Sequence, residues 1–365
     1  GSNGPPKNQN QIDHTRAALA MCENIDWNVG RIINQLKNSG VLENTIVIYL
    51  SDNGPNGNRW NGLMKGRKGS TDEGGVRSPM IINWPGKIPQ GKIVKEIASG
   101  IDLLPTLKDL TGITSQAKKP LDGISLGPLI MQENPIWEDR YIYNYWKGKL
   151  SLRNQHYRLD HQGQLFDMVN DPNQTKDIGE KKPQVLTALH KAKEQWEQEV
   201  LVELPKKDNR PFYIGHPSLH TTQFPARDGI PSGEIKRSNR YPNCAYFTHW
   251  INPEDTITWE AEVAQDGDFE ITVFYSCAED AIGSLFEVSF GDASIQGEIK
   301  EVHNPNEYGA AEDRVLRQES YVKDFKPLKI GTLKLKKGKG TLKIKGIEKK
   351  GRALMDFRLM LLKLI

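Results

Sequence analysis

A short polar segment of the chain combines side chains that suit a divalent cation with one that suits an oxyanion. Asp52 and Asn53 directly follow an apolar run, and Lys68 lies sixteen positions further on, between Gly66 and Gly69. Ca²⁺ takes six to eight oxygen ligands, among them carboxylate and carbamoyl oxygens, at about 2.3–2.6 Å. Because glycine permits close backbone approach, an ammonium group in this loop can contact a bound oxyanion.

Local sequence alone leaves a structural role open for each of these residues. Asp-Asn-Gly is also an ordinary turn sequence. A loop that carries Arg67, Lys68 and Arg77 is also typical of a solvated surface. Glu73, which precedes two glycines, suits a role in fixing the loop by hydrogen bonds better than one as an acid or base.

The segment around Asp52 is flanked by the patterns of a helix and a strand. Residues 11–38 carry apolar side chains at steps of three and four, which predicts one amphipathic helix. Residues 45–51 form a β-branched and aromatic run, which predicts a strand buried on both faces, as in a parallel sheet covered by helices. The apolar helical face consists of Ala18, Cys22, Ile25, Val29, Ile32 and Leu36. Helix, short loop and buried strand together indicate an α/β fold.

The polar stretch 51–79 is rich in Gly and Asn and has little apolar periodicity. Irregular stretches of this length inside a domain are usually functional. Open α/β sheets bind their ligands at the carboxyl ends of strands. A further strand is expected over 80–84, and Asp102 is placed to cap a helix over 103–110.

From about residue 140 the pattern changes to short alternating segments. These predict a small antiparallel sheet followed by a helix over 183–204. The expected strands are 141–145, 151–153, 157–160 and 164–168. Residues 205–218 are rich in Pro, Lys and Asp and are interpreted as a linker.

Beyond residue 218 the apolar pattern has a period of two. Ile257, Trp259, Ala261 and Val263 alternate with polar residues, and similar runs recur between turn signals. Many short alternating strands indicate a β-sandwich or jelly roll. The Lys-rich strands within 326–350 suit either an anionic polymer or, as the plainer interpretation, a sheet edge kept soluble.

Length and composition exclude several classes of protein. The 365 residues correspond to about two domains. A net charge of +3 argues against a dedicated nucleic-acid binder, and no apolar run reaches the length of a membrane span. The polar N-terminal residues show no signal peptide, and the three cysteines lack the spacing of a metal site or a disulfide framework.

The stretch TIVIYLSDNGPNGNRWNGLMKGRKGSTDEGGVRSPMIINWPG resembles the second half of the sulfatase family, whose fold is that of alkaline phosphatase. Both run from a helix through a strand to Ser-Asp-Asn-Gly, then to a Lys-Gly segment, Glu-Gly-Gly-x-Arg-x-Pro and Trp-Pro-Gly. IDLLPTLKDLTG, LDGISL and LFDMVNDPNQ follow in the same order as in the family. The resemblance covers about residues 11–204.

The resemblance implies a role for three matching residues. Asp52 and Asn53 are similar to the family's second pair of Ca²⁺ ligands, and Lys68 is similar to the lysine that contacts the sulfate ester oxygens. Arg67 adds positive charge beside Lys68, and we expect it to contribute to substrate binding. A dication and an ammonium group together neutralise the charge that grows on the sulfuryl oxygens and on the departing oxygen.

The chain also departs from the family. It contains no Cys/Ser-x-Pro-x-Arg motif, whose first residue becomes the formylglycine nucleophile, and Gln223 stands first in the nearest string. The family's first aspartate pair is absent too. Two ligands do not satisfy a cation that takes six oxygens. We therefore expect a Ca²⁺ site only where the missing N-terminal half completes it, and no turnover by this chain alone.

These observations define an α/β fold class, a partial alkaline-phosphatase-like sandwich with a small antiparallel subdomain, plus an all-β jelly-roll domain. Residues 1–139 are interpreted as the C-terminal part of the sulfatase core, 140–204 as the subdomain, 205–218 as a linker and 219–365 as the sandwich. Its segments are similar to carbohydrate-binding jelly rolls, where Trp250, Tyr246 and Tyr308 suit either sugar stacking or core packing.

The leading hypothesis is a sulfatase that acts on sulfated carbohydrates or aryl sulfates, and the family resemblance implies a periplasmic or extracellular location. Two alternatives stay open: a non-catalytic glycan-binding module on a sulfatase remnant, or a related phospho- or phosphonate-ester hydrolase. An unpaired sheet edge would be covered by the missing half or by a second copy, unless the reading frame is truncated.

Overall fold

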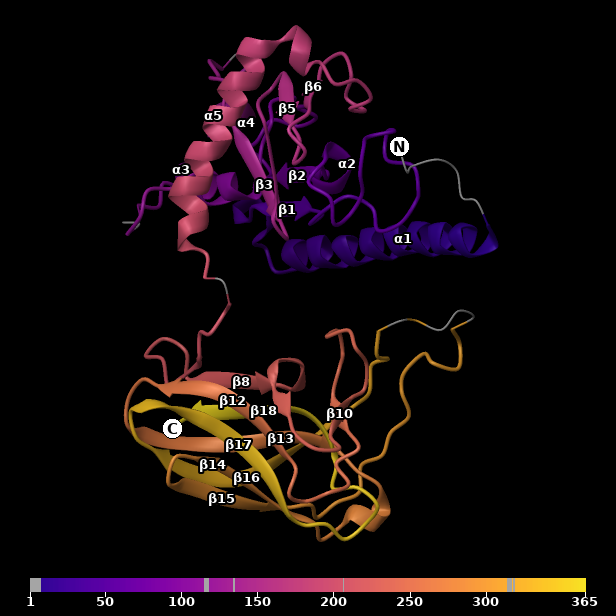
Figure 1. Cartoon of the computed structure of the whole chain (residues 1–365), viewed down its shortest axis with the longest axis vertical. Coiled ribbons are helices and arrows are strands. Elements are labelled where there is room, and N and C mark those ends of the chain that lie inside the picture. The colour runs from indigo at the N-terminus through magenta and orange to yellow at the C-terminus, as the bar shows by residue number, and fades with distance from the viewer. Residues whose placement is uncertain (1–7, 115–117, 134, 206, 314–316, 318) are drawn as a thin grey trace. The chain divides into compact units, whose positions relative to one another are not determined.

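The chain folds as two separate units that divide next to Pro205 (Figure 1). The computed structural model describes residues 8–114, 118–133, 135–205, 207–313, 317 and 319–365. The N-terminal unit is Gly1–Pro205 and the C-terminal unit is Lys206–Ile365. In the described part of the chain, no helix combines the length and the apolar character that a membrane crossing requires.

The N-terminal unit begins with the predicted long helix, α1 (Gln9–Asn38). Its start is capped by Asn8, whose side-chain oxygen accepts a hydrogen bond from the backbone N–H of Gln11 at 3.0 Å. No residue of α1 is buried, and Ile25 and Ile32 on the predicted apolar face are 40% and 58% exposed. On this face Ala18, Val29 and Leu36 are only partly buried.

The strand before Asp52 differs from the prediction. β1 (Val47–Leu50) pairs antiparallel with β2 (Met80–Asn83) in a two-stranded sheet, and Leu50 is 45% exposed. The expectation of a parallel strand buried on both faces is therefore wrong for this chain. The reason is topological: residues 51–79 lead directly back to the edge of β1, and the described residues provide no third strand.

The predicted small antiparallel sheet is confirmed as a four-stranded meander. Its strands lie in the order β3 (Ile142–Trp146), β4 (Lys149–Arg153), β5 (Tyr157–Leu159) and β6 (Leu165–Asp167). Leu189 of α5 (Pro183–Val200) is buried against Leu152, Leu159 and Leu165 from this sheet. The remaining helices of the unit are α2 (Glu73–Val76), α3 (Leu103–Thr111) and α4 (Gly127–Met131).

The C-terminal unit consists of two six-stranded sheets around one hydrophobic core. The first sheet contains β8 (Thr221–Pro225), β10 (Lys236–Arg237), β11 (Phe247–Thr248), β13 (Gly267–Ser276), β16 (Lys326–Leu335) and β18 (Asp356–Leu364). The second contains β7 (Phe212–Ile214), β9 (Ile230–Pro231), β12 (Thr256–Val263), β14 (Leu285–Phe290), β15 (Ala293–Glu298) and β17 (Gly338–Glu348). β7 lies inside the predicted linker and pairs with β12, because its own apolar residues complete that sheet.

The period-two pattern predicted the inward side chains correctly. Ile257, Trp259, Ala261 and Val263 are all at most 1% exposed. Trp250 is also 1% exposed, so its proposed role in stacking on a sugar is wrong and it belongs to the core.

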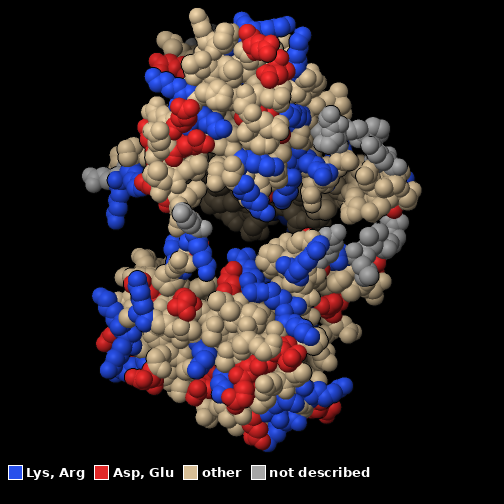
Figure 2. Space-filling view, in the orientation of Figure 1, with Lys and Arg blue, Asp and Glu red and all other residues tan. Residues whose placement is uncertain are grey.

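The Lys-rich strands of this unit carry compensated charge. Lys329, Lys339 and Lys345 pair with Glu270, Glu262 and Glu254 from neighbouring strands or loops. Figure 2 shows acidic and basic side chains interspersed over the visible face of the unit. This arrangement favours the plainer interpretation of a soluble surface over a site for an anionic polymer.

Trp259 joins the two sheets and provides a test of this fold. Its ring lies 5.9 Å from that of Phe224 and 5.7 Å from that of Phe357, both on the opposite sheet. Truncation of such a side chain leaves a cavity, so we expect Trp259→Ala to lower the free energy of unfolding by about 3–5 kcal/mol. Glu260→Ala, at the adjacent exposed position, should change it by about 0.5 kcal/mol or less. Urea denaturation of the full chain, followed by circular dichroism, compares the two variants; an equal loss in both would contradict the core assignment.

Candidate active site

Asp52 and Asn53 lie at the tip of β1, where several bonds hold the backbone beside the segment before β2. The backbone N–H of Gly54 donates to the carbonyl of Gly75 at 3.0 Å, and the Ser78 hydroxyl donates to the carbonyl of Ser51 at 2.7 Å. A Cβ at Gly54 would lie 1.8 Å from the carbonyl oxygen of Gly74. Only glycine fits this close approach, which explains the Gly of the Asp-Asn-Gly sequence.

Lys68 lies next to this tip. Its backbone N–H donates to the carbonyl of Pro55 at 3.1 Å, and its Nζ lies 3.7 Å from Oδ2 of Asp52. Gly66 and Gly69, on either side, have φ values of +86° and +89°, which side chains disfavour. The side chains of Lys68 and Asp52 are 51% and 79% exposed, so both are available to a ligand.

Asp52, Asn53 and Lys68 line the same open cleft of the N-terminal unit. The cleft has a volume of about 1930 Å³, and its other walls include β2, β3 and the segment 88–100. The predicted site residues are thus brought together on one surface. Arg67 is placed differently: its guanidinium donates to the side-chain oxygen of Asn58 at 2.9 Å, and it does not line the cleft.

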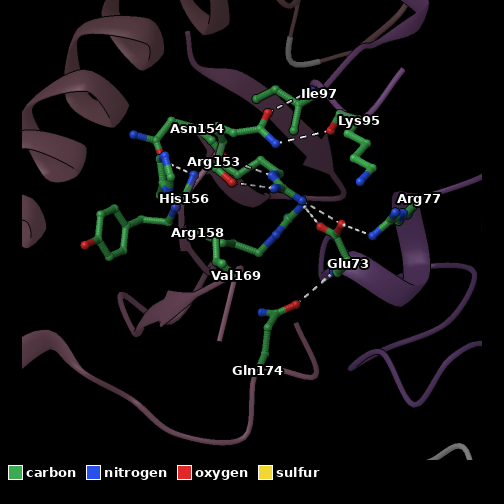
Figure 3. Close-up of polar contacts among 12 residues, drawn as sticks. Glu73, Arg77, Lys95, Ile97, Arg153, Asn154, His156, Arg158, Val169 and Gln174 are labelled. Atoms are coloured by element: carbon green, nitrogen blue, oxygen red, sulfur yellow. Dashed lines mark hydrogen bonds and ion pairs between the residues drawn. The ribbon is translucent and has the colours of Figure 1, made fainter. Parts of the chain in front are cut away.

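A buried carboxylate, Glu73, fixes the loop that carries Lys68 (Figure 3). Arg153 donates to Oε1 of Glu73 at 2.6 Å, and Arg158 donates to Oε2 at 2.7 Å. The backbone N–H of Glu73 donates to the side chain of Gln174 at 2.9 Å. Glu73 is 2% and Arg158 is 1% exposed. The prediction that Glu73 fixes the loop by hydrogen bonds is confirmed.

Further contacts attach the same loop to the antiparallel sheet. The carbonyl of Thr71 accepts from the Ser151 hydroxyl at 2.6 Å and from Arg158 at 2.8 Å. The ammonium of Lys65 lies 3.0 Å from Asp160 and 4.7 Å from the centroid of the Phe166 ring. The loop therefore depends on residues about 80–95 positions later in the chain.

The charges in this network determine the ionisation of Glu73. Burial raises the pKa of the Glu73 carboxyl, but the guanidinium groups of Arg158 and Arg153 outweigh burial and hold that pKa below its usual value. Burial lowers the pKa of Arg158, and the adjacent Glu73 carboxylate opposes this effect. The carboxylate thus stays ionised and serves as a structural anchor.

Asp52 and Asn53 are the residues for which the sequence predicts cation binding. Their oxygens have the chemistry of ligands for a hard cation. The described residues contain no group of three or more His, Cys, Asp or Glu side chains placed to hold a metal ion. The two residues fit a Ca²⁺ site that needs ligands from elsewhere.

The family models identify the N-terminal unit. The sulfatase model matches residues 2–113, and the model of the N-sulphoglucosamine sulphohydrolase C-terminal domain matches residues 68–200. Together they cover more than half of the chain. The N-terminal unit belongs to the sulfatase family.

Parts of the chain are similar to proteins that are longer than the matched regions. A steryl-sulfatase of Rattus norvegicus is 35% identical over 139 residues, which are 35% of this chain and 24% of that protein. A sulfatase of Formosa agariphila is 29% identical over 251 residues, 60% of this chain and 44% of that protein. The protein in the crystal structure of Ps i-CgsB is 31% identical in sequence. The matched region is 47% of this chain and 40% of that chain, with a TM-score of 0.43. The chain thus spans less than half of each, as a C-terminal portion of a sulfatase does.

The resemblance predicted from the Asp-Asn-Gly and Glu-Gly-Gly segments is confirmed. Sequence patterns did not reveal Arg153, Arg158 and Gln174 as partners of Glu73 in the loop of residues 65–77, which is called the sulfatase loop below. Arg158 occupies a strand position whose neighbour Leu159 is fully buried. A basic residue between Tyr157 and Leu159 of this short strand is the signal that could have indicated a buried ion pair.

The Glu73 network provides a test of how the sulfatase loop is held. Loss of Arg158 leaves Oε2 of the buried Glu73 carboxylate without its donor and only Arg153 as a close partner, so Arg158→Met should destabilise the loop by up to about 3–5 kcal/mol. Glu73 has a lowered pKa in the folded state, so its contribution is present above the ordinary value of 4.5 and is lost as the pH falls through the folded pKa.

Hydrogen-exchange protection factors of residues 65–77 measure both effects, because they are corrected for the intrinsic pH dependence of exchange. Wild-type protection should fall below pH 4.5, and Glu73→Gln should remove this dependence on pH. Arg31→Met, which removes an exposed arginine of α1, is the matched control. Unchanged protection in Arg158→Met would contradict the anchoring role.

Proposed function

We propose that this chain is the C-terminal part of an enzyme that hydrolyses sulfate esters of carbohydrates or aryl alcohols. Membership of the sulfatase family supports sulfate ester hydrolysis in general. The observation that carries the proposal is the juxtaposition of Lys68 and Asp52 at 3.7 Å on the wall of an open cleft. The alternative of a phospho- or phosphonate-ester hydrolase has no supporting observation in this cleft.

In this proposal Lys68 binds the ester through its ammonium group. The Lys68 side chain is half exposed and its backbone is bonded to Pro55 beside the strand tip, so the ammonium can contact a sulfuryl oxygen or the bridging oxygen of the ester. Its positive charge stabilises the negative charge that develops on these oxygens in the transition state. Arg67 contributes positive charge from the same loop, beyond the cleft wall, and acts through the electrostatic potential.

Asp52 and Asn53 would hold a Ca²⁺ ion together with ligands from the N-terminal half of the enzyme. The ion, when bound, supplies Lewis-acid stabilisation of the sulfuryl oxygens. Asp52 is free to serve because its only described partner is the exposed ammonium of Lys68. Asn53 would contribute its carbamoyl oxygen as a second ligand.

The remaining parts of the enzyme are assigned by the same proposal. Residues 1–139 form the C-terminal part of the catalytic core and 140–204 its antiparallel subdomain, while the C-terminal unit is an accessory β-sandwich of the jelly-roll type. The N-terminal half supplies the nucleophile, and either this half or a second copy covers the exposed edge of β1. A periplasmic or extracellular location suits an enzyme that acts on sulfated polysaccharides.

The role of the two site residues is testable in a protein where these 365 residues follow a Cys/Ser-x-Pro-x-Arg segment. Lys68→Ala should lower kcat/KM for a chromogenic aryl sulfate by about 10²–10³-fold, as expected for loss of one preorganised charge contact. Asp52→Ala should abolish activity and lower the Ca²⁺ content measured by atomic emission. Lys87→Ala, an exposed lysine outside the cleft, is the control. Unchanged activity and unchanged Ca²⁺ in Asp52→Ala would remove the metal assignment.

The chain by itself provides a second test. It carries Lys68 but no residue in a formylglycine motif, so the purified chain should show no turnover of the aryl sulfate above the buffer rate. The same assay with Lys68→Ala checks for a contaminating enzyme. Turnover that requires Lys68 would show that another residue of this chain acts as the nucleophile.

A further inference from the structure

The cleft that contains Lys68 carries more positive than negative charge. Its lining includes six basic residues and three acidic ones. The basic residues are Lys68, Arg77, Lys92, Lys95, Arg153 and Arg158, and the acidic ones are Asp52, Glu73 and Glu96. A concave surface with such an excess concentrates anions. A single oxyanion bound at Lys68 would neutralise only a part of this excess positive charge.

The excess is concentrated around Glu73. Both oxygens of this carboxylate already accept short hydrogen bonds from Arg153 and Arg158. Arg77 also faces Oε1 of Glu73, at 3.5 Å, with a side chain that is 64% exposed. One negative charge is thus shared among three guanidinium groups, and Arg77 is the most exposed of them.

Lys95 reaches the same place from another segment. Its carbonyl accepts from Gln155 at 3.2 Å, and the side chain of Gln155 also accepts from the backbone N–H of Ile97 at 3.0 Å. Figure 3 shows the Lys95 side chain directed toward Arg77 and Glu73. In the described part of the chain its ammonium has no ion-pair partner, and the residue is exposed.

Arg77 lies close to the proposed catalytic groups. The segment 75–78 runs beside residues 51–54, as the hydrogen bonds from Gly54 to Gly75 and from Ser78 to Ser51 show. Paired backbones of this kind lie about 5 Å apart. An anionic group on Arg77 can therefore belong to the same molecule as a sulfate ester on Lys68.

The plainer interpretation is that Arg77 only supports Glu73. An exposed ion pair four residues apart contributes little, about 0.3–0.5 kcal/mol. Since Glu73 already has two better donors, its structure does not depend on Arg77. This reading also leaves the unpaired ammonium of Lys95 on the same wall without a role.

We propose that Arg77 and Lys95 form a second anion-binding subsite, which accepts a further sulfate or carboxylate group of the substrate. The inference rests on the proposed function, since it takes the sulfate ester at Lys68 as the first contact. It identifies the substrate class as oligosaccharides with at least two anionic groups close together, rather than simple aryl sulfates.

Binding of matched sugars to the 365-residue chain tests the proposal. The probes are a disaccharide with one sulfate, the same disaccharide with two sulfates, and a monosulfated disaccharide with a uronate carboxylate, each titrated by isothermal calorimetry with Ca²⁺ present. The second anionic group should increase affinity by up to about fivefold, the upper end of what one exposed ion pair contributes. The uronate and disulfate probes distinguish the two sources of the second anion.

Variants assign the gain to the two residues. Arg77→Gln and Lys95→Gln should each remove the preference for the doubly charged probes while affinity for the monosulfate stays the same. Lys87→Gln, which changes the charge by the same amount outside the cleft, should keep the preference. Thermal unfolding of each variant checks that it is folded.

Three results would overturn the inference. Equal affinity for singly and doubly charged probes removes the second subsite, and the proposed function survives if Lys68→Ala still weakens monosulfate binding. A preference that persists in both Arg77→Gln and Lys95→Gln places the second anion elsewhere. Absence of binding by every probe at millimolar concentration contradicts the subsite, whereas the proposed function is decided separately by the activity of Lys68→Ala and Asp52→Ala in the protein that carries the Cys/Ser-x-Pro-x-Arg segment.

Discussion

The candidate site depends on one buried interaction, the carboxylate of Glu73 held between Arg153 and Arg158. A buried carboxylate without partners is strongly unfavourable, and removal of one partner from a buried pair costs several kcal/mol. The pair therefore acts less as a source of net stability than as a geometric constraint. It allows only those arrangements of the 65–77 loop in which Glu73 reaches the antiparallel sheet.

The same constraint explains how reactive side chains can be exposed and still be positioned. Lys68 and Asp52 face solvent and hold one another only weakly. Their backbones, however, are fixed on both sides: Lys68 by its bond to Pro55, and the Asp52 tip by the contacts of Gly54 with Gly75. The contacts of Glu73 that support the loop are buried, whereas the candidate reactive side chains, Lys68 and Asp52, are exposed. This agrees with the usual division between a scaffold and a functional loop.

Sequence patterns predicted the elements whose signal is local. Apolar residues at steps of three and four predicted α1, and apolar residues with a period of two predicted the inward side chains of β12. Neither pattern depends on a distant partner. Long-range pairing was not predictable in the same way. β1 was assigned to a parallel sheet because a continuous apolar run does not identify its neighbour, and Arg158 was missed because Glu73 is 85 positions away. The candidate site residues were predicted from the Asp-Asn-Gly and Lys-Gly segments, because each of these signals lies within a few consecutive residues.

The Asp52–Lys68 contact connects the two halves of the proposed chemistry. At 3.7 Å between well-exposed groups, the pair contributes about 1 kcal/mol or less. A dication held by Asp52 and Asn53 would compete with the ammonium of Lys68 for the Asp52 carboxylate, and Lys68 would then be available to a bound oxyanion. The weakness of the ion pair is therefore what suits it to a binding site, because a strong pair would compete with the substrate.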